Sequence, residues 1–444
     1  MLMADLIEPR TLKGFRDYLP ELMIPREHIL EQARQVYRSY GFAPIDTPAL
    51  EYAEILLGKG GEESDKLIYR FTDHGGRDVA LRFDLTVPFA RFAAQHIGKL
   101  GTPFRRYHMG PVWRGENTAH GRYREFWQCD FDTIGTTANS ADIEIVLVIR
   151  DLLHAIGLKR FRIRVNNRLL LNGLLEEWDL AGKAKPLLVA LDKLEKQGAA
   201  SVVEEMQHKA GIGAAQAERV VALAEIRGGN EEILDRLERE FGTNAKVAEG
   251  VCRLRELIQV AHAAGHTEEE LQVDLATARG LDYYTGTIYE TTLTDLPGIG
   301  SICSGGRYDN LAGLYTKQHL PGVGASLGLD RLLAAMEELK LLDKVATPAP
   351  VLMVQFTSER LADYARMAAG LRAAGIGVEL FPEAKKVGQQ LQYAERRGFR
   401  VALIAGPDEF AQGFWKVKDL ARREEVTVAG GEVVAALCKL LTGP

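Results

Sequence analysis

The chain has 444 residues, of which 46% are hydrophobic and 26% are charged, and its formal net charge is −6. This balance is typical of a folded globular protein and excludes the disordered and fibrous classes. The length predicts two or three domains, because a single core rarely grows beyond about 250–300 residues. A negative charge argues mildly against nucleic-acid binding, since phosphate backbones are usually met by basic surfaces. From Val351 onward, however, 13 Lys and Arg stand against 11 Asp and Glu, so this part is weakly basic.

The N-terminus and the cysteines indicate a cellular compartment. The first residues, MLMADLIEPRTLKG, contain acidic residues and a proline where a signal peptide requires an unbroken apolar core. No segment has the length and apolarity of a membrane span. We therefore predict a cytoplasmic protein without membrane contact. The four cysteines lie far apart in the sequence, so they predict neither a zinc site nor a disulfide framework. They are Cys129, Cys252, Cys303 and Cys438.

The first third of the chain changes from helical to strand periodicity. Apolar residues recur at helical spacing over residues 24–40, and a short strand containing Ile45 follows. Between residues 65 and 116 the pattern is one of short strands separated by Gly and Pro, with examples at 79–86 and 102–114. This part therefore predicts an antiparallel sheet.

The remainder divides into a helical segment and a second α/β segment. Helix-forming residues dominate from about 168 to 270, which predicts a helical insertion in a first domain spanning 1–345. The sequence ATPAP at 346–350 is typical of a linker. Residues 351–444 then alternate strand and helix patterns (VLMVQF, GVELF, VALIAG), which predicts a small α/β domain with mainly parallel crossovers.

Two segments, REFWQCDFDTIG and LRFDLT, alternate polar and apolar residues with the period of a strand. The polar positions are Gln128, Asp130 and Asp132 in the first segment, and Arg82, Asp84 and Thr86 in the second. One interpretation is a solvated sheet face, which is common. The other is a pocket wall. Carboxylates and hydrogen-bonding groups on two strands would suit histidine, whose ammonium needs oxygen acceptors and whose imidazole needs a partner at each ring nitrogen.

Five arginines stand at turns or strand ends near glycine, and these are Arg114, Arg122, Arg279, Arg307 and Arg331. Individually each fits a surface ion pair, but together they suggest a polyphosphate ligand, which guanidinium groups bind with several donors. The stretch GVGASLGLDR has GxGxxxG spacing and excludes a dinucleotide loop, and no GxxxxGK[ST] loop is present. The histidines have no metal-ligand spacing, so we predict no metal site.

The order of these blocks resembles that of the histidyl-tRNA synthetase family of class II aminoacyl-tRNA synthetases. KGFRDYLPE with YGFAPIDTPALE resembles the first class motif, WRGENTAHGRYREF the second and GVGASLGLDRLL the third. ARGLDYYTGTIYE and SGGRYDNL resemble the two blocks peculiar to the histidine enzyme. The resemblance implies an α+β fold: an antiparallel sheet with flanking helices and a helical insertion, followed by a C-terminal α/β anticodon-binding domain. It also implies a homodimer whose interface includes Pro48.

The resemblance also assigns site residues. Arg114 would hold the ATP α-phosphate, Glu116 the adenine amine and Arg122 the γ-phosphate, and adenine would lie between Phe126 and Arg331. Arg114 and Arg279 would be catalytic. The histidine-binding residues would be Asp84, Thr86, Arg114, Gln128, Asp132, Arg279, Tyr283, Tyr284 and Tyr308. Many bacterial members carry glutamates where this chain has Asp84 and Asp132, and the shorter side chain shifts the carboxylate by about one carbon–carbon bond.

The implied activity is ATP-dependent ligation of L-histidine to tRNA(His) through a histidyl adenylate, with Mg²⁺ accompanying ATP and release of AMP and diphosphate. Possible RNA contacts in the last domain are Lys385, Lys386, Gln389, Lys416 and Lys418. One alternative is an inactive, histidine-binding regulatory subunit of ATP phosphoribosyltransferase, but such proteins typically lack the anticodon domain and parts of the ATP-binding set. Another is an RNA-binding adaptor with a degraded site, which predicts erosion of the polar strand faces.

Overall fold

The computed structural model describes residues 6–57, 67–278, 283–342 and 346–442. These residues divide into two compact units. The larger unit contains the described residues up to Arg16 and Ile29–Leu339, and the smaller contains Asp17–His28 and the described residues from Lys340 onward. Helix α1 (Pro20–Ser39) contributes residues to both. None of the described helices combines the length and apolarity needed to cross a membrane.

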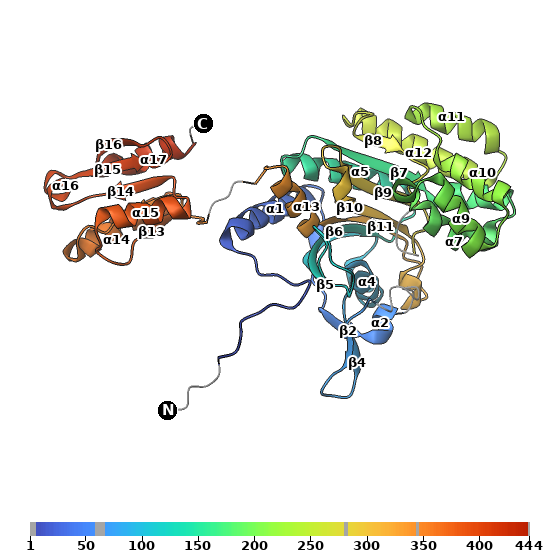
Figure 1. The fold of residues 1–444 in the computed structure, drawn as a ribbon, viewed down its shortest axis with the longest axis horizontal. Helices are drawn as coiled ribbons and strands as arrows, with labels where there is room; N and C mark the ends of the chain where they lie inside the picture. Colours follow the sequence, from blue (N-terminus) through green and yellow to red (C-terminus); the bar gives the residue numbers. More distant parts are fainter. Residues whose placement is uncertain (1–5, 58–66, 279–282, 343–345, 443–444) are drawn as a thin grey trace. The chain divides into compact units, whose positions relative to one another are not determined.

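The larger unit is built on one sheet with the strand order β1-β5-β6-β11-β10-β9-β7-β8 (Figure 1). Neighbours from β5 to β7 in this order are antiparallel, whereas β1 and β8 pair in parallel at the two edges. This arrangement confirms the predicted antiparallel sheet. The strands are β1 (Ala43–Pro44), β5 (Phe104–Trp113), β6 (Glu125–Ile134), β7 (Phe161–Asn167), β8 (Leu271–Val273), β9 (Thr287–Leu293), β10 (Cys303–Tyr308) and β11 (Gly322–Gly328).

The centre of this sheet is covered on both faces. On one face, Tyr37 of α1 packs against Phe131 of β6, with 5.0 Å between ring centroids. On the other, Phe89 of α4 (Thr86–Leu100) lies 4.4 Å from the guanidinium of Arg106, which is opposite Asp132 in the β5–β6 register. Asp132 is therefore only 2% exposed. A solvated polar face is the wrong interpretation of this strand, because a second layer covers the side that carries the carboxylates.

The predicted strand at 79–86 is wrong in its second half. Strand β4 (Asp78–Leu81) stops at Leu81 and α4 begins at Thr86. The reason is local: Asp84 Oδ1 accepts a hydrogen bond from the Val87 amide at 3.0 Å, and Pro88 fits the first turn of a helix. The alternation of Arg82, Asp84 and Thr86 is thus not a sheet face. Strand β4 lies between β2 (Leu50–Tyr52) and β3 (Arg70–Thr72) in a separate antiparallel sheet.

A group of helices separates β7 from β8 in the chain (Figure 1). Helices α6 and α12 pack closely at Gly250, where a Cβ atom would lie only 2.8 Å from Leu170 Cβ. The helices of the larger unit beyond α1 and α4 are α2 (Ala53–Leu57), α5 (Asn139–Ala155), α6 (Arg168–Glu177), α7 (Ala184–Leu191), α8 (Leu194–Gln197), α9 (Ala199–Ala210), α10 (Ala214–Ala224), α11 (Asn230–Phe241), α12 (Ala245–Ala263) and α13 (Leu329–Glu338).

The smaller unit has its own sheet, with the order β13-β12-β14-β15-β16. Strand β12 pairs in parallel with β13 and β14, as predicted, but β14/β15 and β15/β16 are antiparallel. The prediction of mainly parallel crossovers is therefore correct only for its first half. A parallel crossover needs a dozen or more residues, and the connections on either side of β15 are shorter. The domain limits and the linker at 346–350 stay predictions.

The strands of the smaller unit are β12 (Val351–Met353), β13 (Val378–Leu380), β14 (Val401–Ile404), β15 (Phe414–Asp419) and β16 (Glu424–Ala429). Its helices after α1 are α14 (Leu361–Ala373), α15 (Val387–Arg397), α16 (Pro407–Gln412) and α17 (Val433–Thr442). Buried Tyr364 joins the layers, because its hydroxyl donates to the Ala405 carbonyl at 2.7 Å. The alternation of strands and helices after residue 350 is confirmed.

Candidate functional site

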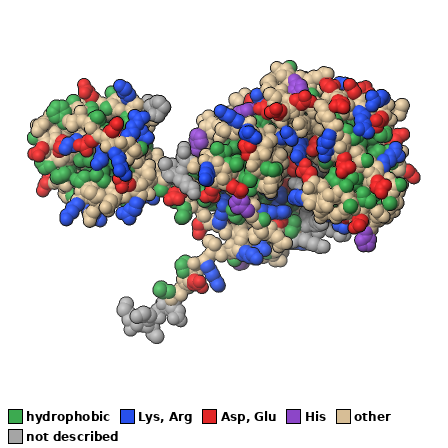
Figure 2. Space-filling model, turned by 45° about the horizontal axis from the view of Figure 1, so that its top comes forward, with side chains coloured by type: hydrophobic (Ala, Val, Ile, Leu, Met, Phe, Trp, Pro, Cys, Tyr) green, Lys and Arg blue, Asp and Glu red, His purple; other side chains and the backbone are tan. Residues whose placement is uncertain are grey.

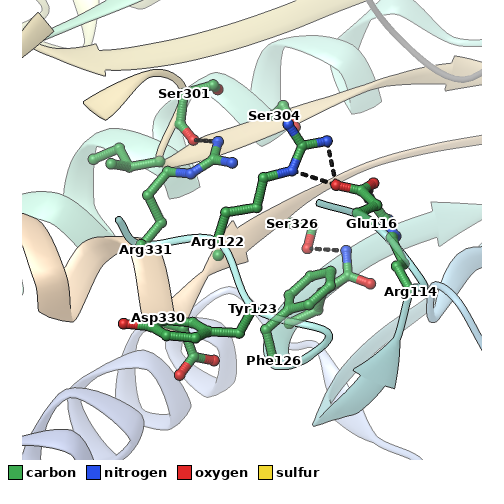
Figure 3. Close-up of a pocket in the computed structure, with 14 residues that line it drawn as sticks. Arg114, Glu116, Arg122, Tyr123, Phe126, Ser301, Ser304, Ser326, Asp330 and Arg331 are labelled. Carbon is green, nitrogen blue, oxygen red and sulfur yellow. Dashed lines mark hydrogen bonds and ion pairs between the residues drawn. The ribbon is translucent and has the colours of Figure 1, made fainter. Parts of the chain in front are cut away.

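A pocket of about 160 Å³ is formed by the β5–β6 connection, β10, β11 and the start of α13 (Figure 3). It brings together every residue predicted to bind ATP: Arg114, Glu116, Arg122, Phe126 and Arg331. The wall also contains residues that were not predicted to bind ATP, among them Tyr123, Gln128, Ser301, Ser304, Ser326 and Asp330. The individual roles of these residues in binding stay predictions.

Arg331 and Arg114 are each held by a backbone carbonyl at this pocket. Arg331 Nη1 donates to the Ser301 carbonyl at 2.6 Å. Arg114 Nε donates to the Phe83 carbonyl at 2.8 Å, and its guanidinium lies 5.1 Å from the centre of the Phe126 ring. An arginine side chain carries five N–H donors in a fixed plane. In each case a backbone carbonyl orients the planar guanidinium at the pocket wall.

Arg122 and Glu116, which both line the pocket, form an ion pair with each other (Figure 3). The Arg122 side chain is 52% exposed, whereas that of Glu116 is 14% exposed. The predicted roles place these residues at opposite ends of ATP. Binding in that mode requires the ion pair to open, and the exposure of the Arg122 side chain leaves it room to turn away from Glu116.

Sequence reasoning missed Arg16 as a support of this pocket. Arg16 Nη2 forms an ion pair with Asp330 Oδ1 at 3.0 Å, and Arg16 Nη1 donates to the Tyr123 hydroxyl at 2.8 Å. The second carboxylate oxygen of Asp330 accepts from the Trp127 amide at 2.6 Å. Arg16 lies within KGFRDYLPE, which was assigned to a class motif as a whole. Its long-range partners cannot be identified from spacing.

A second group of predicted residues combines buried Asp84, Asp132 and Tyr308 with partly buried Tyr283 and Tyr284. The Tyr308 hydroxyl donates to Asp132 Oδ1 at 2.7 Å, and the Tyr283 hydroxyl donates to Asp84 Oδ2 at 3.3 Å. The rings of Tyr283 and Tyr284 meet edge to face at 5.2 Å. All five of these residues, which are predicted to bind histidine, thus contact another member of the group.

Two other predicted residues complete this arrangement. Gln128 lines the first pocket and donates through Nε2 to Ser326 Oγ at 2.9 Å, while its own strand continues to Asp132. Gln128 therefore connects the two groups. Thr86 is the first residue of α4 and lies close to the Tyr283 hydroxyl.

Two glycines provide room for these side chains in the sheet. Gly324 lies opposite Asp132 in the β6–β11 register, and a Cβ atom there would lie 2.1 Å from Asp132 Oδ1. Gly306, which pairs with Gly324, would place a Cβ atom 3.0 Å from the Tyr284 ring. Cβ atoms at these positions would occupy the space of the carboxylate and the phenol, so the absence of a side chain shapes this part of the site.

Arg106 was also missed, although it is the only guanidinium that the described residues place in an ion pair with Asp130 or Asp132. Its Nη2 lies 2.7 Å from Asp132 Oδ2 and 3.6 Å from Asp130 Oδ2. Burial raises the pKa of Asp84 and Asp132 and raises the pKa of Asp130 to about 7, whereas Arg106 lowers all three. A signal was available: Arg106 belongs to a strand that pairs with β6, and alternation along RRYHMG places it on one face.

Arg307, one of the five arginines near glycine, does not line this pocket. Arg307 is buried in an ion pair with Asp142, and its Nη1 lies 3.2 Å from Asp309 Oδ1. A shared ligand is therefore the wrong explanation for Arg307. Its charge is already matched by carboxylates. Arg279 lies outside the described residues. Within the described part of the chain, no three Asp, Glu, His or Cys side chains gather as metal ligands.

Comparisons with known proteins agree with this geometry. The histidyl-tRNA synthetase family matches residues 14–332, and the anticodon binding domain family matches residues 350–440. A histidine–tRNA ligase from Rhodopirellula baltica is 59% identical over 424 residues, which cover 96% of each chain. The crystal structure of histidyl-tRNA synthetase from Nostoc sp. PCC 7120 has a TM-score of 0.89 at 35% identity, covering 98% of this chain and 100% of that one.

A more distant structure bears on the regulatory alternative. An ATP phosphoribosyltransferase regulatory subunit/histidyl-tRNA synthetase from Bacillus halodurans has a TM-score of 0.72 at 24% identity, covering 88% of this chain and 97% of that one. At that identity the likeness shows the fold alone. The ligase matched over nearly the full chain at 59% identity and the family match over residues 14–332 are decisive. This chain belongs to the histidyl-tRNA synthetase family.

Proposed function

We propose that this protein is a histidine–tRNA ligase, which activates L-histidine with ATP and transfers it to tRNA(His). One observation carries the proposal: strand β6 contributes Gln128 to an arginine-lined pocket and Asp132 to a group of carboxylates and tyrosines. The first suits a polyphosphate. The second suits an imidazole and an ammonium, which need oxygen acceptors. A site for histidyl adenylate requires both environments side by side.

In the first step, a carboxylate oxygen of histidine attacks the ATP α-phosphorus. The bond between this phosphorus and the bridging oxygen of diphosphate breaks, and histidyl adenylate forms. In the second step, a ribose hydroxyl at the tRNA 3′ end attacks the histidyl carbonyl carbon, and AMP leaves. Phosphoryl-type transfer depends mainly on positioning and on neutralising charge. Arg114, oriented by the Phe83 carbonyl, would supply this charge together with Arg279.

Mg²⁺ would accompany ATP and neutralise part of the phosphate charge. It is commonly held by one or two carboxylates together with substrate phosphates. Selection of histidine would depend on Asp132 and on the tyrosines that surround it. Another amino acid would leave these buried polar groups unpaired, which discriminates strongly in sites built on hydrogen bonds.

The smaller unit would bind the anticodon arm. Figure 2 shows its Lys and Arg side chains interspersed with acidic ones on the visible face. Of the predicted contacts, Lys416 is in an ion pair with Glu409 at 2.9 Å and Lys385 is in one with Glu383 at 2.8 Å. An RNA phosphate would compete with these exposed carboxylates.

We also propose that the protein works in the cytoplasm.

We propose a homodimer on the basis of the small sheet. Tyr52 and Phe71 flank Val79 in register and are 50% and 48% exposed, and Leu50 on the same strand as Tyr52 is 39% exposed. Pro48, the residue that resembles the interface proline of the family, is also exposed. Clustered apolar exposure of this kind marks interaction surfaces. Sedimentation analysis should give a dimer for the native chain and a monomer for Phe71→Asp.

The experiment that tests the function is histidine-dependent exchange of labelled diphosphate into ATP, first without tRNA, followed by transfer of labelled histidine to tRNA(His). Exchange together with transfer is the expected outcome. Histidine binding without exchange would instead identify a regulatory, non-catalytic protein. Failure of both exchange and histidine binding would overturn the proposal.

A further inference from the structure

Arg106 is fully buried at the back of the carboxylate group. It extends from β5 and faces Asp132 across the β5–β6 register, and its exposed fraction is 0%. Its Nη2 lies 2.7 Å from Asp132 Oδ2, and the ring of Phe89 covers the guanidinium at 4.4 Å. Arg106 does not line the nucleotide pocket. Arg106 can therefore influence the site through its contact with Asp132.

Asp132 is held from two opposite sides. Arg106 meets Oδ2, while the Tyr308 hydroxyl donates to Oδ1 at 2.7 Å. On the neighbouring strand, Gly324 lies so close that a Cβ atom there would be 2.1 Å from Oδ1. Loss of either partner would free the carboxylate to rotate. Its present direction thus depends on Arg106 and Tyr308 together.

Arg106 also contacts the segment that carries the other predicted histidine ligands. Its Nη2 donates to the Leu85 carbonyl at 3.2 Å, between Asp84 and Thr86. A single side chain therefore connects β6 with the start of α4. Asp132 on β6 and Asp84 and Thr86 at the start of α4 are all predicted to bind histidine.

Stability alone is a poor explanation for this arginine. Taking a guanidinium out of water costs several kcal/mol, and an apolar replacement of a buried ion pair is often neutral or stabilising. Moreover, Nε and Nη1 of Arg106 have no hydrogen-bond partner among the described residues. By contrast, buried Arg307 directs its Nε, Nη1 and Nη2 toward Asp142, Asp309 and backbone carbonyls. The ion pairs of Arg106 are instead made with Asp130 and Asp132, two carboxylates of the site.

We propose that Arg106 is a positioning residue for histidine selection, which fixes the direction of the Asp132 carboxylate without touching the substrate. This inference rests on the proposed function, because Asp132 must be the side chain that meets the imidazole. Arg106 holds Asp132 against Tyr308 and keeps the Asp84–Thr86 segment at a constant separation from β6. Movement of a binding group by about 1 Å can lower turnover efficiency about 100-fold.

A double-mutant cycle tests the proposal, with Arg106→Met, Asp132→Asn and the combined variant measured by histidine-dependent diphosphate exchange. Arg106→Met should lower kcat/KM for histidine by about 100-fold through a raised KM, with KM for ATP changed less than about twofold. In the Asp132→Asn background the same substitution should cost less than about threefold, because contacting residues that act as one unit are not additive. Discrimination of histidine against glutamine should fall in parallel.

Arg106→Lys provides the second variant, since it retains the charge and is more readily accommodated if Arg106→Met fails to fold. It should lose part of the histidine efficiency, and only when Asp132 is present. Equal losses in the two backgrounds, or equal rises in KM for histidine and ATP, would overturn the proposal. Wild-type protein without any histidine-dependent exchange would instead refute the proposed function, so the two failures are distinguishable.

Discussion

Arg16 and Asp330 form an ion pair of 3.0 Å although 314 positions separate them in the chain. The pair joins the N-terminal segment to the first turn of α13, directly before Arg331. Arg16 simultaneously donates to Tyr123, which lines the same pocket as Asp330. The two walls of the nucleotide pocket are therefore tied together by a residue that does not itself line it.

Replacement of Arg16 by glutamine should raise KM for ATP about tenfold and change KM for histidine less than about twofold. The reason is that Asp330, with a side chain 2% exposed, would lose its charged partner and Tyr123 would lose a donor. Diphosphate exchange at varied ATP and varied histidine gives both constants. Arg34→Gln is the matched control, since Arg34 pairs with Glu31 at the surface and should be neutral. Equal changes in the two KM values would contradict a role at the nucleotide pocket.

Replacement of Arg122 by glutamine should weaken ATP binding about tenfold and leave AMP binding unchanged. Arg122 is paired with Glu116 and is half-exposed, so its guanidinium can turn toward the γ-phosphate, which AMP lacks. Calorimetric titration with each nucleotide measures the two affinities. If ATP and AMP lost affinity equally, Arg122 would be acting on the nucleoside or α-phosphate and the assigned role would be wrong.

Gly324→Ala should abolish detectable histidine binding and lower the free energy of unfolding by about 1–3 kcal/mol. The added Cβ atom would lie 2.1 Å from Asp132 Oδ1 and 2.6 Å from the Phe131 carbonyl oxygen, so the carboxylate and the strand pairing must both shift. Urea unfolding and histidine titration provide the two readouts. Gly313→Ala, where no atom lies within 4 Å of the added Cβ, should change neither. Normal histidine affinity in Gly324→Ala would show that Asp132 tolerates displacement.

Asp130 should make stability depend on pH in a direction opposite to that of most carboxylates. Burial raises its pKa to about 7 in the folded protein, whereas an unfolded aspartate has a pKa of about 4. Between these values the folded state binds more protons, so the contribution of Asp130 to the free energy of unfolding decreases as pH rises. Asp130→Asn lacks this titration. Its stability relative to wild type should therefore increase from about pH 4 to pH 7 and stay constant above.

Urea unfolding of both proteins across that range measures this difference. The neighbouring His108, whose pKa is lowered to about 3 mainly by burial, titrates in both proteins, so its contribution largely cancels in the comparison. Asp78→Asn is the control of opposite sign, because the hydrogen bond from Arg70 lowers the pKa of Asp78. Its stability relative to wild type should fall as pH rises through the acidic range. A difference for Asp130→Asn that does not vary with pH would refute a protonated, buried Asp130.

The strand with polar residues at 128, 130 and 132 was predictable because its period of two is maintained over the six residues from Trp127 to Asp132. The same period at Arg82, Asp84 and Thr86 led to a wrong prediction of a strand. There, Asp84 bonds to the Val87 amide and starts a helix, and this local hydrogen bond outweighs a pattern only three positions long. The pairing of β15 was missed for a related reason, since connection length determines strand direction as much as alternation does.

Local periodicity was sufficient to predict the antiparallel sheet, and the resemblance of short sequence blocks to a known family was sufficient to predict the family and the pocket residues from Arg114 to Arg331. Only the tertiary structure determined the partners of Arg16, Arg106 and Arg307. Each is a guanidinium, and sequence alone does not distinguish one that supports a site from one that pairs elsewhere. What distinguishes them is which carboxylate lies within about 3 Å after folding, and that distance depends on strand register and helix packing between distant segments.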